Sequence, residues 1–443
     1  MSVEDLEAAL AAVSLAEAPD DWALAAYRLA VAESEATTRP SDIEHALGLL
    51  DKAARILSAD RAPVEHGRIV TAAANCHRAA GRAERALELF RLAAELLEPR
   101  ASAAERAGAL INVGLAHCET GQPEAAIAAL DRALALMAAT NSAEHERALG
   151  RPQHDEADEV TRLRGAALIN RAQAHQSVGT SADLEAAVDD YRAALAALPP
   201  ASLQAGMAAH GLGAAVLEMC RQGSSARQPQ EAVAAFEQSL GVLSHASFPF
   251  HHAVARHSLA LAYEMRGKPG DLARALNSVQ ASLSVFDPRL HASHWRTAHS
   301  TLSRLEAALD ERHPGTGRRG HVAHLLAEVT DDEREQLLRD RLQRAASLPP
   351  TAIRADLEAL IGSAAALGPD DYRRVLRSVI GVLMELPDHL LETACATLCD
   401  IHRQHASAAA LDEALDAVIN ERLFGPQRVR VRDLLESHGW VRP

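Results

Sequence analysis

Aromatic residues are scarce in this chain. They make up 3% of its 443 residues, although 48% of the residues are hydrophobic, and alanine and leucine supply most of that apolar content. Alanine has the highest intrinsic helix propensity, and its small side chain lets helices approach closely. A core of alanine and leucine with few rings fits many thin helix–helix interfaces and does not fit one thick globular core. We therefore expect an all-α protein.

Basic charge and long apolar runs are also limited. The formal net charge is −15, and a nucleic-acid binder needs a basic face, so we expect no nucleic-acid partner. No apolar run of about 18 residues is free of charges, so we expect no membrane span. The N-terminal segment is acidic and lacks the basic start of a secretory signal.

Cysteine and lysine are rare as well. An odd count of five cysteines favours reduced thiols in a cytoplasmic protein over a disulfide framework. Lys52 and Lys268 are the only lysines among many arginines, a bias that is typical of a GC-rich bacterial gene. The sequence also contains no nucleophile elbow, phosphate-binding glycine loop, zinc-protease motif or kinase motif. We therefore expect a non-catalytic protein without a cofactor.

The chain does contain an internal repeat. Each copy starts at a turn and places small and large apolar residues on one helical face. The copies are 41–57, 81–97, 121–137, 181–198, 227–243 and 270–286. Each follows another helical segment, and the last five of these preceding segments end at glycines, which adopt the left-handed backbone cheaply. These glycines are Gly81, Gly121, Gly179, Gly223 and Gly267.

The segment ALINVGLAHCETGQPEAAIAALDRALALM at 109–137 resembles a tetratricopeptide repeat. Gly114 stands where that family has a small residue between its paired helices. The family's remaining packing positions are filled by Ala126, Leu130 and Ala133. Matching copies cover about residues 20–287. The resemblance implies a right-handed α-solenoid of about six helix pairs, each stacked on its neighbours.

A different repeat follows the helix pairs. Residues 331–361 align with residues 370–399 at an offset that pairs Leu338 with Leu376. Each copy consists of a helix, a Leu-Pro step and a second helix, and proline suits the start of that second helix. These hairpins are similar to HEAT-type repeats. They predict a smaller C-terminal helical-hairpin domain, in which a third hairpin follows.

The expected organisation has four parts. An N-terminal helix or extension covers 1–19, the solenoid and its capping helix cover 20–312, a linker covers 313–320, and the C-terminal domain covers 321–443. Within the solenoid, the polar and acidic stretch 139–162 is interpreted as a surface loop, with a lid or partner contact as the alternative.

One cysteine and histidine cluster has the spacing of a metal site. Its members are Cys395, Cys399, His402 and His405. The first three share one helical face and are of the types that bind zinc. However, the C-terminal repeat aligns leucine and isoleucine with the two cysteines. Buried core cysteines are therefore the preferred interpretation, no metal is expected, and a zinc site is the alternative.

Histidine is abundant elsewhere in the chain. The groups His251, His252, His257 and His291, His294, His299 are interpreted as surface or groove residues, with a metal or haem site as the alternative. His77, His117 and His175 recur at a position where the family has a packing aromatic residue, so we expect them to pack in the core.

The tetratricopeptide resemblance implies a binding face. In that family, the first helix of each pair lines a concave groove. Matching places the following residues on or near it: Thr71, Asn75, Arg78, Asn112, Leu115, Glu119, Asn170, Gln173, His257, Leu261 and Glu264. The asparagine amides both donate and accept hydrogen bonds, so they suit a peptide backbone of any sequence. Family members that bind a C-terminal carboxylate also use basic residues, but the matching positions here hold Thr71, Ala166 and Asn170.

The function that these features favour is a cytoplasmic interaction scaffold. Its groove is expected to hold a peptide or protein, and its C-terminal domain to dock a second partner or to form a homodimer. One alternative is a signalling or transcription regulator that senses a peptide or small ligand through the solenoid. The least favoured alternative is a histidine-dependent metal or haem enzyme.

Overall fold

The computed structural model describes residues 2–36, 39–98, 100–140, 153–224, 227–312 and 317–443. Regular secondary structure in these ranges is helical throughout, as expected. The chain forms two compact units, Met1–Arg227 and Gln228–Pro443, called unit 1 and unit 2 below. Across the described residues, none of the helices has the length and hydrophobicity needed to cross a membrane.

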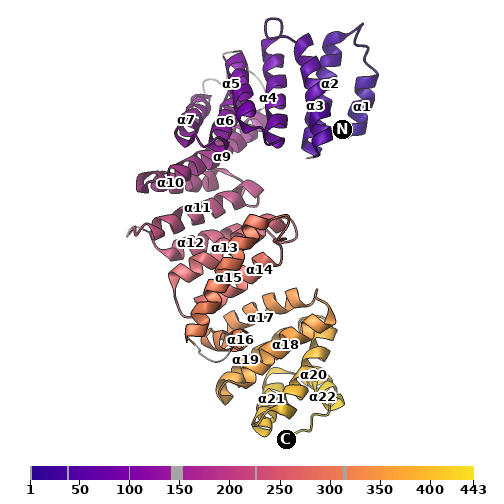
Figure 1. Cartoon of the computed structure of the whole chain (residues 1–443), viewed down its shortest axis with the longest axis vertical. Coiled ribbons are helices and arrows are strands. Elements are labelled where there is room, and N and C mark those ends of the chain that lie inside the picture. The colour runs from indigo at the N-terminus through magenta and orange to yellow at the C-terminus, as the bar shows by residue number, and fades with distance from the viewer. Residues whose placement is uncertain (1, 37–38, 99, 141–152, 225–226, 313–316) are drawn as a thin grey trace. The chain divides into compact units, whose positions relative to one another are not determined.

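Unit 1 is a series of helices packed as antiparallel pairs (Figure 1). Its helices are α1 (Val3–Ala11), α2 (Pro19–Ala36), α3 (Pro40–Ile56), α4 (Pro63–Ala79), α5 (Ala83–Leu97), α6 (Ala103–Glu119), α7 (Pro123–Thr140), α9 (Gln153–Val178), α10 (Ser181–Ala197) and α11 (Leu203–Arg221). The helices α2/α3, α4/α5, α6/α7 and α9/α10 pack as consecutive pairs, as the repeats predicted.

Adjacent helices approach closely where one of them offers a glycine, both within a pair and between a pair and the next helix. A Cβ atom on Gly114 of α6 would lie 2.6 Å from Cγ of Leu130 on α7, the predicted small and large residues of the pattern. A Cβ atom on Gly211 of α11 would lie 2.3 Å from Cζ of Tyr191 on α10. Real side-chain atoms do not approach this closely, so the helix spacing at these two points depends on glycine.

The ends of the paired helices follow the predicted signals. All five repeat glycines have φ between 65° and 80°, the left-handed conformation expected after a helix end. The polar stretch 139–162 is helical where it is described: α7 continues to Thr140, and α9 begins at Gln153. The remainder of that predicted loop lies outside the described residues.

Unit 2 is also helical in its described residues. Its helices are α12 (Pro229–Val242), α13 (Pro249–Arg266), α14 (Asp271–Leu283), α15 (Ala292–Arg312), α16 (Gly317–Glu328), α17 (Asp331–Ala345), α18 (Pro350–Ala365), α19 (Pro369–Leu383), α20 (Asp388–Gln404), α21 (Ala408–Arg422) and α22 (Gly425–Ser437). Helices α13 and α14 form a further pair. The linker expected at 313–320 lies inside this unit. Residues 317–320 start α16, residues 313–316 lie outside the described residues, and the boundary stays a prediction.

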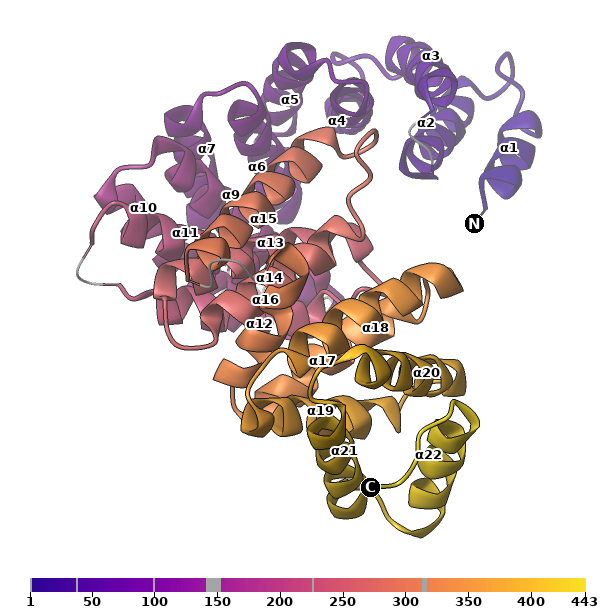
Figure 2. The same ribbon diagram turned by 60° about the horizontal axis from the view of Figure 1, so that its bottom comes forward.

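The C-terminal helices pack differently from the pairs. Each contacts mainly the helices two before and two after it, so α17, α19 and α21 form one layer and α16, α18, α20 and α22 form another. Figure 2 shows α17, α19 and α21 in one row beside α18, α20 and α22. The predicted Leu-Pro steps precede α18 and α20, with Pro349 and Pro387 at the N-caps of these helices. The core shared by the two layers is rich in leucine, isoleucine and valine.

We predict that Gly211→Ala destabilises unit 1 by about 1–3 kcal/mol, because overpacking a closely packed core costs this much. Tyr191 cannot move aside freely: its side chain is 1% exposed, and its hydroxyl donates to Oε1 of Gln176 at 2.5 Å. Urea unfolding followed by circular dichroism measures the change.

The matched control is Gly48→Ala in the middle of α3, where an added Cβ atom meets nothing within 4 Å. Alanine in an open helical position stabilises by about 0.5–1 kcal/mol relative to glycine. Equal effects of the two substitutions would show that the contact of Gly211 with Tyr191 does not limit the helix spacing.

Candidate functional site

The predicted partner-binding residues of unit 1 lie on three neighbouring first helices. Helix α6 packs on α9, and two ion pairs join α4 to α6: Arg68–Glu105 at 2.6 Å and Arg78–Glu119 at 3.4 Å. Each predicted side chain is half-buried or exposed, and thus accessible from solvent at least in part. These residues are Thr71, Asn75 and Arg78 on α4, Asn112, Leu115 and Glu119 on α6, and Asn170 and Gln173 on α9.

Asn112 and Asn170 occupy the same position on adjacent helices. Asn112 lies nine residues before Gly121, and Asn170 lies nine residues before Gly179. Both side chains are half-buried, as is that of Asn75. Within the described part of the chain, none of these three amides forms a hydrogen bond to another protein group. Their donors and acceptors are therefore available to a bound molecule.

A buried ion pair holds the helix that carries Asn170. The adjacent Arg171 makes two hydrogen bonds to the Asp190 carboxylate of α10, at 2.8 and 2.5 Å, and a third to Asp131 of α7 at 2.5 Å. Asp190 is only 6% exposed. The hydrogen bonds to Asp190 raise the pKa of Arg171 above its usual value, so the cation is firmly held. This arrangement fixes α9 between two neighbours. The repeat pattern did not predict it.

The predicted residues of unit 2 contact the next first helix. His257 Nε2 lies 3.1 Å from the Thr301 hydroxyl of α15, and Arg304 of α15 donates two hydrogen bonds of 2.7 Å to Glu264. Leu261 lies between them in sequence and is half-buried. In this unit, the predicted polar residues His257 and Glu264 form hydrogen bonds to the neighbouring helix. In unit 1, the predicted asparagines form no hydrogen bond to another group of the described residues.

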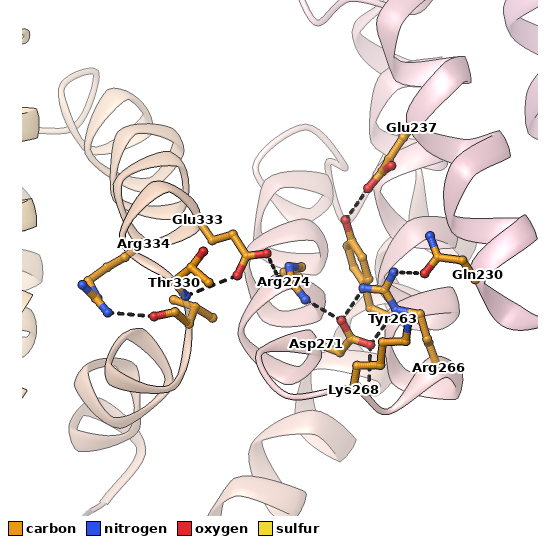
Figure 3. Close-up of polar contacts among 11 residues, drawn as sticks. Gln230, Glu237, Tyr263, Arg266, Lys268, Asp271, Arg274, Thr330, Glu333 and Arg334 are labelled. Carbon is orange, nitrogen blue, oxygen red and sulfur yellow. Dashed lines mark hydrogen bonds and ion pairs between the residues drawn. The ribbon is translucent and has the colours of Figure 1, made fainter.

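A polar network within unit 2 was also not predicted (Figure 3). At its centre is the Asp271 carboxylate, which is 1% exposed and starts α14. It accepts hydrogen bonds from Arg266 at 2.8 and 2.5 Å, from Arg274 at 2.7 Å and from the Lys268 amide at 2.9 Å. Burial alone raises the pKa of Asp271, but these donors outweigh it and hold the pKa below the usual value.

The network extends from Asp271 in two directions. Arg274 pairs with Glu333 at the start of α17, which joins α14 to α17. On the other side, Arg266 lies over the Tyr263 ring, 5.1 Å from its centroid, and the Tyr263 hydroxyl donates to Glu237 of α12 at 2.9 Å. The sequence signal for this network is an acid directly after a turn glycine, with arginines on both sides of it. The contact with Glu333 has no such local signal.

The cysteine and histidine cluster is part of the C-terminal core. Cys395, Cys399 and His402 are 2–3% exposed. Burial raises the pKa of Cys395 to about 12 and that of Cys399 to about 11, which favours the neutral thiols over metal-binding thiolates. Both nitrogens of His402 are used: Nδ1 donates to Asp412 at 2.7 Å, and Nε2 lies 2.6 Å from the Tyr372 hydroxyl. No group of three metal-ligating side chains converges among the described residues.

The other histidine groups pack against rings and polar neighbours. His291 and His294 each have a ring centroid 5.1 Å from that of Phe250, and His299 stacks on Trp295 at 4.8 Å. His117 is 4% exposed, as its predicted core position requires, and its Nδ1 lies 3.1 Å from Oε1 of Gln122. These contacts give His117, His291, His294 and His299 packing roles, whereas His77 and His175, also expected in the core, are half-buried.

Comparisons with known proteins concern the fold. No protein-family model matches the chain, and neither does any curated protein. A crystal structure of YrrB, a TPR protein with an unusual peptide-binding site, is 16% identical, covering 54% of this chain and 93% of that one, with a TM-score of 0.33. The apo form of RapI is 12% identical over 95% of this chain and 93% of that one, with a TM-score of 0.41. A Podosopora anserina putative kinesin light chain with TPR-like repeats is 18% identical, covering 57% of this chain and 99% of that one, with a TM-score of 0.35.

The buried His402 predicts a pH dependence of stability. Burial lowers its pKa below 6.5, and the contact with Asp412 opposes this shift without reversing it. Below about pH 6.5, the unfolded chain takes up a proton that the folded chain does not, so the stability falls as the pH falls. We expect the thermal midpoint of unit 2 to decrease from about pH 7.5 to about pH 5.5, and His402→Gln to reduce that decrease.

The control is His438→Gln, which removes an exposed histidine from the same region. Scanning calorimetry at several pH values compares the three proteins. If His402→Gln and the wild type lose the same number of degrees on acidification, the buried His402 does not contribute to the pH dependence.

Proposed function

We propose that this protein is a non-catalytic interaction scaffold that binds an extended peptide segment across α4, α6 and α9. The observation that carries the proposal is the pair of half-buried amides at Asn112 and Asn170. They occupy the same position on adjacent first helices, and no protein group in the described residues bonds them. The polar atoms of these amides reach solvent, and a peptide backbone supplies donors and acceptors that replace the water there.

The helix spacing suits an extended chain. Packed helices lie about 8–10 Å apart, and an extended peptide advances about 3.3 Å per residue. Successive first helices therefore meet the peptide about every third residue. Asn170, Asn112 and Asn75 supply one amide on each of the three helices. Amides recognise the backbone of the peptide, so they add affinity without demanding a particular sequence.

Side chains around the amides define the remaining surface. Leu115 on α6 provides an apolar contact, and Gln173 on α9 is an exposed amide that reaches solvent. The charges of Arg78 and Glu119 are paired with each other, so neither presents a free charge to a ligand. This agrees with the lack of a basic clamp in the sequence. The proposed partner is therefore held along its length and not by a terminal carboxylate.

Rigid helices make such a surface effective. Arg68 with Glu105 joins α4 to α6, and Arg171 joins α9 to α7 and α10 through Asp131 and Asp190. A preorganised surface loses little conformational freedom when a ligand binds, so more of the contact energy appears as affinity. The proposal also places the protein in the cytoplasm with a protein or peptide partner, as expected from its reduced cysteines and the tetratricopeptide resemblance.

We predict that Asn112→Ala combined with Asn170→Ala weakens peptide binding by about 10-fold or more, because two hydrogen-bonding groups are lost. Peptides of about 12 residues, long enough to cross three helices, are selected from a random phage-displayed library against the wild-type protein. Calorimetry then measures the affinity of the selected peptides for each variant.

The matched control is Gln238→Ala, which removes an exposed amide from the second helix α12. It is expected to bind the selected peptides like the wild type. Circular dichroism confirms that each variant is folded. Unchanged affinity in the folded double variant would place the peptide site elsewhere.

A further inference from the structure

Unit 2 contains a pocket of about 490 Å³, whereas the residues of the proposed peptide surface belong to unit 1. Its walls come from α13, α14 and α17, with His245 contributed by the segment before α13. This volume is in the range of small-molecule sites. The lining residues are His245, His252, Arg256, Ala281, Ser284, Asp340, Gln343, Arg344, Ser347 and Leu348.

Arg344 brings to this pocket a positive charge that no carboxylate of the described residues contacts directly, although Asp340 and Asp356 act on it through space. Its Nη2 donates to Oδ1 of Asn277 at 2.5 Å, which is a neutral acceptor. Within the described residues, no carboxylate forms an ion pair with Arg344. Burial lowers the pKa of Arg344 to about 10, so the folded protein holds the cation at a cost and still keeps it charged at neutral pH. An anion in the pocket offsets this cost.

The one carboxylate in the lining is already shared. Asp340 accepts hydrogen bonds from Gln336 at 2.9 Å and from Asn277 at 3.3 Å, and it lies 3.7 Å from Nη1 of Arg256. Two arginines thus face one aspartate in the pocket of a protein whose overall charge is −15. The local excess of positive charge runs against the composition of the chain.

His252 and Arg256 hold each other in place. Nδ1 of His252 lies 2.7 Å from the Leu243 carbonyl and therefore donates to it. Its Nε2 accepts a hydrogen bond from Nε of Arg256 at 3.3 Å. These contacts fix the direction in which the remaining N–H groups of the Arg256 guanidinium point. His245 packs edge-on against His252, with the ring centroids 5.8 Å apart.

The walls of the pocket are fixed before any ligand arrives. Arg274 joins α14 to Glu333 at the start of α17 (Figure 3). Further along α17, Asp340 and Arg344 both form hydrogen bonds with Asn277 of α14. Gly270 adds a close approach beside this junction, because a Cβ atom there would lie 2.6 Å from Cγ1 of Val329. The positions of the two arginines are therefore set by the fold.

We propose that this pocket is a binding site for the phosphate group of a small phosphorylated molecule, held by Arg344 and Arg256. Guanidinium groups bind phosphate oxygens with directed, charge-assisted hydrogen bonds. The pocket offers hydrogen-bond donors from two arginines and, at its exposed rim, from the Ser347 hydroxyl and the Gln343 amide. These donors are more numerous than the hydrogen bonds that the two oxygens of a carboxylate accept. The site is distinct from the peptide surface, so it equips the same chain to respond to a metabolite.

The test is calorimetric titration of the full chain with inorganic phosphate, up to about 10 mM at constant ionic strength, with acetate as the carboxylate comparator. We expect phosphate to bind in this range and acetate to bind at least about 10-fold more weakly. Arg344→Gln is expected to weaken phosphate binding by about 10-fold or more, because it removes a charged donor. Arg289→Gln, an equal charge change at an exposed residue outside the pocket, is expected to leave it unchanged.

A second variant covers the case in which Arg344→Gln unfolds. Ser347 is exposed at the rim, so Ser347→Glu leaves the core intact and adds a carboxylate that competes with the ligand for the arginines. It is expected to weaken phosphate binding by a similar factor. The proposal is overturned if the folded wild type does not bind phosphate, if acetate binds as tightly, or if Ser347→Glu binds phosphate like the wild type.

Discussion

The close approach of adjacent helices is the constraint on which the rest of this structure depends. At its tightest points a glycine stands on one helix, and a large side chain of the adjacent helix fills the space. Gly114 with Leu130 and Gly211 with Tyr191 show this at distances that exclude any added carbon. Because one side chain serves each contact, the chain forms a long apolar interface with few aromatic residues.

This packing also decides which residues remain for binding. The small residues of the first helices face their partners, so the polar residues beside them, such as Asn112 and Asn170, lie on the remaining surface. Helix α6 packs on α9, and the equal positions Asn112 and Asn170 therefore lie on neighbouring helices. In unit 2 the regularity changes after α14, where Asp271 and its arginines connect the last pair to layered helices. The change leaves a pocket lined by α13, α14 and α17.

Local patterns predicted the fold well. The segments expected at 121–137 and 270–286 are α7 and α14 with ends displaced by up to three residues, because periodicity, glycine and proline act within one helix. For the candidate site, the repeat pattern predicted which residues lie on the exposed side of the first helices, but not the contacts that hold these helices. Contacts such as Arg274 with Glu333 join residues far apart in sequence, and no periodic pattern encodes which of many arginines meets which acid. The same holds for the Arg344 pocket and for His402 of α20, whose partners Tyr372 and Asp412 lie on α19 and α21.

The most direct test of the account is hydrogen–deuterium exchange of the full chain with and without a peptide selected for binding. Exchange reports protection along each helix separately, so it locates the bound face without any substitution. The account predicts that added protection concentrates on the first helices α4, α6 and α9, around Asn75, Asn112 and Asn170. Protection confined to the second helices α5, α7 and α10, with none on the first helices, would contradict it.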